Sequence, residues 1–170
     1  METNTQIIIS LLTIIGSGVV SAFITQKLVT SRSEKEFKRK KIEELFLSVH
    51  KYCRGLSVAN MVWPEVAAGK INYNEAIDIV TKSDKSSYLG AYESSEMIVK
   101  LYFPHLEKDF DKILLTRKEI GFAKLNLKRD YENQSDLTEY VSLFNKLLIQ
   151  IENVEKEFKN SIANERMKIK

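Results

Sequence analysis

The sequence predicts an all-α protein in which a single transmembrane helix precedes an antiparallel helical bundle. One uncharged apolar stretch is long enough to cross a bilayer, and several later segments repeat apolar residues at the helical period. No sustained alternation of apolar and polar residues indicates a β-sheet. With six glycines and two prolines in 170 residues, the composition is typical of helix-rich proteins.

The first element is the apolar stretch. From Ile7 to Gln26, twenty consecutive residues carry no charge, and a helix of that length spans about 30 Å of hydrocarbon. The segment from Lys27 to Lys41 contains seven basic residues and two acidic ones. Because basic flanks stay on the cytoplasmic side, residues 1–30 are expected to be a membrane anchor with its N-terminus outside, and residues 31–170 a cytoplasmic bundle. A cleaved export signal is the alternative.

Small and hydroxyl-bearing residues follow one face of this predicted helix. They are Ser10, Thr13, Ser17, Gly18, Ser21, Ala22 and Thr25. Small residues let helices approach closely, and hydroxyls can bond across the contact, so this stripe predicts self-association. Two alternatives remain open: the hydroxyls bond to their own helix, or several copies line a pore.

The basic run after the apolar stretch predicts contact with anionic lipid headgroups, with a purely topological signal as the alternative. The residues predicted to make this contact are Lys35, Lys38, Arg39, Lys40 and Lys41. Nucleic acid is not an expected partner, because Phe37 is the only aromatic residue interleaved with the run.

The bundle begins with a predicted helix from about Ser33 to Val62, which stops or bends near Pro64. A short helix capped by Asn72 or Asn74 follows. The next helix is predicted over Lys85 to Tyr102. Its expected core side is Leu89, Tyr92, Met97, Ile98 and Leu101.

Two long helices complete the predicted bundle. The first covers about Pro104 to Tyr131 and the second about Asp136 to Arg166, where Asp136 and Glu139 have the spacing of a capping box. The apolar stripe of the last helix fits either a bundle core or a coiled-coil face. For the helix from about Pro104 to Tyr131, the expected core residues are Leu106, Phe110, Ile113, Leu114, Ile120 and Leu127.

No pattern of catalytic, cofactor-binding or metal-binding residues is found in the sequence. His50 and Cys53 are three residues apart on one helix, but two ligands are too few for a metal site, and Cys53 lies within an apolar stripe. His105 is expected at the surface or at a helix start. The segment LYFPHL, from Leu101 to Leu106, fits either a docking corner or a plug at the end of the bundle.

The layout as a whole resembles small bacterial single-pass membrane proteins, some of them carried by prophages or phage-defence loci. The features that carry the resemblance are GSGVVSAFIT in the apolar stretch, KEFKRKKIEELF after it, and LYFPHL in the helical body. The resemblance transfers no functional residues. It implies the bacterial inner membrane and a role in phage or stress response.

These observations together predict a non-enzymatic interaction module without cofactors. Its expected partners are membrane lipids and either another copy of the chain or a different protein, with no small-molecule substrate. A pore-forming effector and an accessory or scaffold subunit of a membrane complex are the alternatives.

Overall fold

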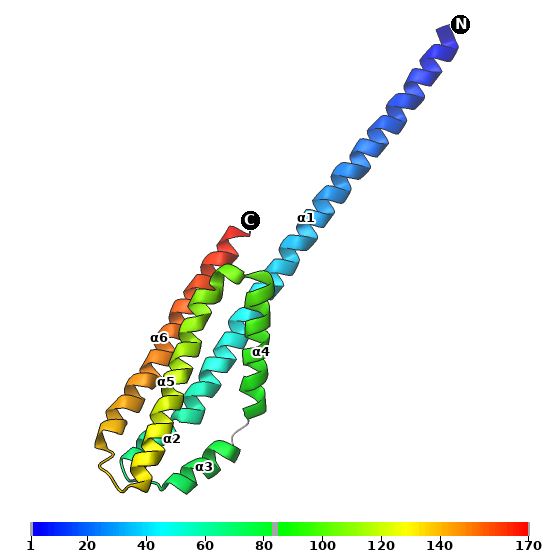
Figure 1. Ribbon diagram of the computed structural model, residues 1–170. Helices are drawn as coiled ribbons and strands as arrows, with labels where there is room; N and C mark the ends of the chain where they lie inside the picture. Colours follow the sequence, from blue (N-terminus) through cyan, green and yellow to red (C-terminus); the bar gives the residue numbers. More distant parts are fainter. Residues whose placement is uncertain (1, 83–84, 170) are drawn as a thin grey trace. The chain divides into compact units, whose positions relative to one another are not determined.

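The computed structural model describes the backbone of residues 2–82 and 85–169, and the side chains of residues 21, 25–82 and 88–169. All regular elements in these ranges are helices, so the all-α prediction is confirmed (Figure 1). The chain divides into two compact units, one ending at Lys40 and one from Lys41 to Ile169. The elements are α1 (Glu2–Asn60), α2 (Val62–Ala67), α3 (Tyr73–Lys82), α4 (Lys85–Tyr102), η1 (Pro104–Leu106), α5 (Glu107–Glu132) and α6 (Thr138–Lys168).

The prediction of a membrane-crossing anchor is wrong. In the part of the chain that the structure describes, no helix combines the length and the apolar character needed to cross a bilayer. Most side chains of the predicted span, residues 7–20 and 22–24, lie outside the described residues. From Thr25 onward, where the side chains are described continuously, α1 carries the charged run from Lys27 to Lys41, which is costly in hydrocarbon. The expectation of a single-pass protein of the inner membrane, with residues 1–30 as its anchor, is corrected accordingly.

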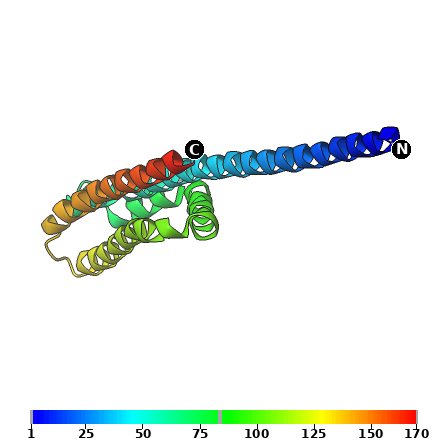
Figure 2. The same ribbon diagram turned by 90° about the horizontal axis from the view of Figure 1, so that it is seen from above.

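Side-chain contacts show that neighbouring long helices of the second unit run antiparallel. The hydroxyl of Ser48 in α1 lies 3.3 Å from that of Ser94 in α4, and Tyr52, further along α1, stacks against Tyr92, earlier in α4. α5 and α6 pair in the same way and lie side by side in Figure 1. Figure 2 shows the same helices from above. The predicted antiparallel bundle therefore describes this unit.

A row of aromatic rings links the four long helices of the bundle. Ring centroids lie 5.4 Å apart between Tyr52 of α1 and Tyr92 of α4, and 6.2 Å apart between Tyr92 and Phe110 of α5. Phe110 in turn lies 5.7 Å from Phe158 of α6. Tilted and offset arrangements at these distances are favourable for aromatic pairs. The row fixes the centre of the core.

A close approach between α1 and α4 depends on Gly55. A Cβ atom at this position would lie 2.7 Å from the ring carbon Cγ of Tyr88, well inside van der Waals contact. On α4, Ala91 and Ser95 are also buried. The predicted core side of α4 is therefore wrong in part: Leu89, Met97 and Leu101 are exposed.

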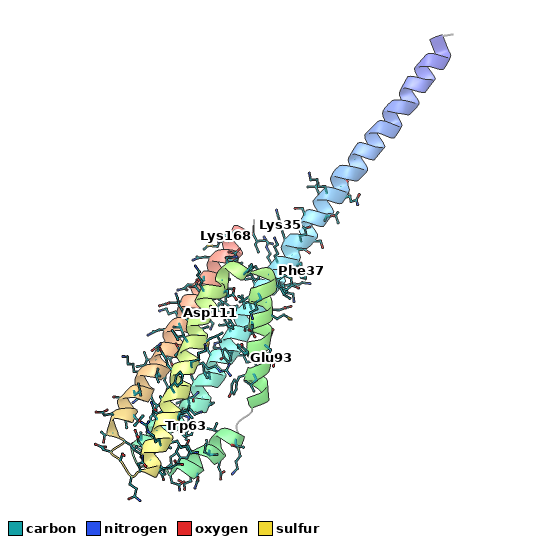
Figure 3. The ribbon with its side chains drawn as sticks, viewed as in Figure 1. Lys35, Phe37, Trp63, Glu93, Asp111 and Lys168 are labelled. Atoms are coloured by element: carbon teal, nitrogen blue, oxygen red, sulfur yellow. The ribbon has the colours of Figure 1, made fainter. Side chains whose placement is uncertain are left out.

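The break after α1 comes before Pro64. α1 ends at Asn60, and Pro64 lies in the first turn of α2, where its missing N–H costs no hydrogen bond. Trp63 is fully buried beside it (Figure 3), with its ring 5.5 Å from that of Tyr73 in α3. The predicted Asn72 cap is confirmed, because its side chain accepts a hydrogen bond from the Glu75 N–H at 2.9 Å.

The structure also decides two predictions about helix ends, one for the LYFPHL segment and one for the start of α6. Phe103 and Leu106 are buried, so the LYFPHL segment packs into the end of the bundle. At the start of α6, the Asp136 carboxylate accepts hydrogen bonds from the backbone N–H and the hydroxyl of Thr138, at 2.9 and 2.6 Å. The predicted capping box between Asp136 and Glu139 does not form, because the contact is made one residue earlier.

Candidate protein-interaction surface

The His50 and Cys53 pair of α1 forms a structural cluster. Nδ1 of His50 lies 2.9 Å from a carboxylate oxygen of Glu155 and 3.0 Å from the ammonium of Lys159, both on α6. Cys53 is fully buried, and burial, reinforced by the Glu155 carboxylate, raises the pKa of its thiol to about 12. A thiol that stays protonated is a poor nucleophile and a poor metal ligand.

His105 has a similar arrangement further along α6, near its C-terminal end. Its Nε2 lies 2.9 Å from a carboxylate oxygen of Glu165, which also accepts a hydrogen bond from Lys168 at 2.9 Å. The pKa of Glu165 is lowered: partial burial opposes the shift, but the hydrogen bonds from Lys168 and His105 outweigh it. Among the described residues, no three potential metal ligands gather. Both histidines tie α6 to its neighbours.

The residues predicted for self-association fall mostly outside the described side chains. Ser10, Thr13, Ser17, Gly18 and Ala22 belong to that group, whereas Ser21 and Thr25 are exposed on α1. Their role remains a prediction.

The residues predicted for headgroup contact are all described. Lys35 (labelled in Figure 3), Lys38, Arg39 and Lys40 are exposed on α1. Lys41 is half-buried, and its hydrogen bond to Glu44, at 2.5 Å, is the main cause that raises the pKa of its ammonium. Lipid contact through these residues also remains a prediction.

An apolar stripe on the outer side of α5 was not predicted from the sequence. Its members are Leu115, Phe122 and Leu125, with exposed fractions of 57%, 67% and 66%. They occupy positions i, i+7 and i+10, the a and d spacing of a heptad, so they share one side of the helix. We call this set the outer stripe. The inner stripe, formed by Phe110, Ile113, Ile120 and Leu127, is buried in the bundle.

A groove of about 390 Å³ runs between α5 and α6 beside the outer stripe. Phe122 belongs to its α5 wall, and Leu143, exposed by 38%, belongs to its α6 wall. The remaining lining residues are Glu119, Ala123, Asn126, Lys146, Leu147 and Gln150.

Hydrogen bonds hold the polar part of this groove in place. The Gln150 side-chain amide donates to a carboxylate oxygen of Glu119 at 2.8 Å and lies 3.2 Å from the Thr116 hydroxyl. Thr116 is buried and donates to the Lys112 carbonyl at 3.1 Å. The α5–α6 contact beneath the groove is therefore ordered, and a partner would meet a preformed surface, which lowers the entropic cost of binding.

A second depression, of about 500 Å³, lies where the α2–α3 loop meets the α5–α6 turn. Several of its polar groups already have partners: Asn72 and Glu75 form a reciprocal cap, Lys70 pairs with Glu65 at 2.9 Å, and Asp136 binds Thr138. These contacts account for the polar groups as caps and turns, so the α5–α6 groove is the better candidate surface.

The sequence did contain a signal for the outer stripe. Leu115, Phe122 and Leu125 are off the core stripe of the same helix but keep heptad spacing among themselves. A search for one apolar face per helix assigns such residues no role. A search for a second periodic set would have found them.

No protein-family model, curated protein or solved structure matches the chain. The resemblance in layout to small bacterial membrane proteins, and the link to phage or stress response, therefore remain predictions.

Proposed function

We propose that the chain is a non-enzymatic helical interaction module whose α5–α6 groove and outer stripe bind a helix of a protein partner. The observation that carries the proposal is the outer stripe itself: three large apolar side chains at heptad spacing, each more than half exposed, beside a groove to whose opposite wall Leu143 and Leu147 contribute. An amphipathic helix laid into a hydrophobic groove is a recurrent mode of protein recognition.

The energetics favour such a partner. Burying one large apolar side chain stabilises a complex by about 1.5–3 kcal/mol, so Leu115, Phe122 and Leu125 together would offset much of the entropic cost of association. An exposed apolar patch that is rimmed by polar residues is a common mark of a protein-interaction site. Phe122, next to the groove, is the expected anchor.

Self-association and an accessory role in a larger complex are the two other forms of this proposal. In the first the bound helix belongs to a second copy of the chain, and in the second it belongs to a subunit of the complex. The two differ in the mass of the crosslinked product, so one experiment separates them.

The test places a photoreactive phenylalanine analogue at position 122 of the protein in the organism that produces it. The matched control places the same analogue at Ile149, which is also exposed (59%) but does not line the groove. We expect a discrete crosslinked species from position 122 and none from position 149. Equal labelling from both positions, or none from either, would refute the proposed surface.

A further inference from the structure

The charge around the outer stripe identifies the kind of helix that the surface fits. Resting on the proposed function, we infer that the bound segment is an acidic amphipathic helix, with apolar residues on one side and Asp or Glu flanking them. The inference depends on the distribution of charge along α5, on the partners of each charged group, and on the wall contributed by α6.

The segment of α5 that carries the outer stripe is strongly basic. Between Lys112 and Arg129 there are six basic residues and one acidic residue, Glu119. Over the whole of α5 the two signs nearly balance, because the other acidic residues lie at its two ends. The positive charge is therefore concentrated in the segment of α5 that carries the outer stripe, although Arg117 and Lys124 turn toward the rings of Tyr92 and Trp63.

Some of these cations already have partners within the bundle. Lys112 lies 3.0 Å from Asp109, and Lys128 lies 3.8 Å from Glu132. Arg129 lies 3.2 Å from Asp130. Arg117 and Lys124 lie over the rings of Tyr92 and Trp63, at 5.3 and 4.9 Å from the ring centroids, so both take part in cation–π contacts within the bundle.

Two cations next to the groove have no ion-pair partner among the described residues. Lys118 occupies the d position between Leu115 and Phe122 on α5, and Lys146 lines the α6 wall. The one carboxylate between them, on Glu119, already accepts the Gln150 amide. A helix seated in the groove would therefore meet unpaired positive charge on both sides of its apolar residues.

Charge complementarity then favours one occupant. Acidic side chains on the bound helix would approach Lys118 and Lys146, and opposite charges at the rim of an interface raise the association rate and exclude wrong partners. Two copies of the chain pairing through this surface would bring two basic segments together, which is unfavourable. The partner is thus a different helix of opposite charge.

The experiment selects helices from a phage-displayed library against the full-length protein. Each displayed helix is about three heptads long, with Leu fixed at a and d and with random residues at the flanking positions. A parallel selection against the Phe122→Asp variant identifies helices that bind through the groove. We expect Asp and Glu to be enriched about tenfold or more over Lys and Arg at the flanking positions of groove-dependent helices.

A charge-reversal variant sharpens the result. The double substitution Lys118→Glu and Lys146→Glu changes two exposed side chains and should leave thermal unfolding unchanged. With this variant, acidic helices should lose about tenfold or more in affinity and basic helices should gain. Affinity of the wild type for acidic helices should also fall with salt.

The outcomes separate the two proposals. Enrichment of basic or neutral flanks among groove-dependent helices overturns the acidic partner and leaves the interaction surface standing. If no helix distinguishes the wild type from the Phe122→Asp variant, the surface itself is wrong. If size-exclusion chromatography with light scattering finds a dimer that Phe122→Asp abolishes, the occupant is a second copy and the inference fails.

Discussion

The two apolar stripes of α5 have similar composition and opposite environments. The inner stripe packs against α4 and α6 in the aromatic core, whereas the outer stripe lies in solvent beside the α5–α6 groove. Hydrophobicity alone therefore does not determine which residues support the fold. Position relative to the neighbouring helices decides whether an apolar residue stabilises this chain or is available to another one.

The largest expected effect tests the inner stripe. Leu127 is fully buried, so Leu127→Ala should lower the free energy of unfolding by about 2–5 kcal/mol through lost burial and the cavity left behind. Urea unfolding followed by circular dichroism measures it. Leu125→Ala, two residues earlier on the outer stripe, is the matched control and should change stability by less than about 0.5 kcal/mol. Equal effects at the two positions would remove the distinction between the stripes.

A second substitution examines whether packing on the inner side tolerates extra volume. Gly55→Ala would place a methyl group against the ring of Tyr88, so α1 and α4 would have to separate. We expect a loss of about 1–3 kcal/mol in unfolding free energy, in spite of the higher helix propensity of alanine. Gly121→Ala is the control, since a Cβ there meets nothing within 4 Å, and it should be neutral or stabilising. A stabilised Gly55→Ala variant would contradict the close approach.

A smaller effect concerns a polar link at the border between α5 and α6. The Ser161 hydroxyl donates to Asp109 at 2.7 Å and, together with Lys112, lowers the pKa of that carboxyl, with burial opposing. Because the folded pKa is depressed, this contribution is present above the ordinary pKa and is lost as the pH falls through the folded value. Ser161→Ala should cost about 1 kcal/mol at neutral pH.

The pH dependence supplies the control for this link. Thermal unfolding of the wild type should become easier below about pH 4, where the Asp109 carboxyl begins to protonate in the unfolded chain while it stays ionised in the folded one. The difference between the wild type and Ser161→Ala should shrink over the same range. A difference that stays constant down to strongly acidic pH would show that the serine acts through packing and not through the carboxylate.

The smallest expected effect on stability is at the outer stripe itself. Phe122→Asp replaces an exposed ring and should change the unfolding free energy by less than about 0.5 kcal/mol, while it abolishes partner binding. Urea unfolding measures the first quantity, and crosslinking from a photoreactive analogue placed at Leu125, on the same outer stripe, measures the second. If this variant binds the partner normally, the outer stripe is not part of the binding site.

Much of the bundle could be predicted because its helices carry local signals. The bounds of α4 were predicted at Lys85 and Tyr102, as found. Of the two predicted caps, Asn72 forms, and of the two readings of the α6 stripe, the bundle core is found. Capping and periodicity are properties of one segment, so they are visible without knowledge of the rest of the chain.

The remainder depends on contacts between segments. Leu89, Met97 and Leu101 of α4 look like a core side, but they are exposed. α4 meets α1 through Tyr88, which lies against Gly55, and through Tyr92 and Ser94. A hydrophobic pattern on one helix does not show that a glycine on its neighbour will permit this approach. The groove likewise forms only because α5 and α6 lie side by side. Which apolar stripe of α5 remains exposed depends on how the helices pack, and the sequence of α5 alone does not show it.

Cys53, the only cysteine, is enclosed at the centre of the bundle, and burial raises the pKa of its thiol to about 12. An alkylating reagent can therefore react with it only when the helices part, so the labelling rate counts openings of the native protein in real time. This single sulfur atom lets opening of the bundle be followed without an engineered label, and shows whether a bound partner makes opening rarer.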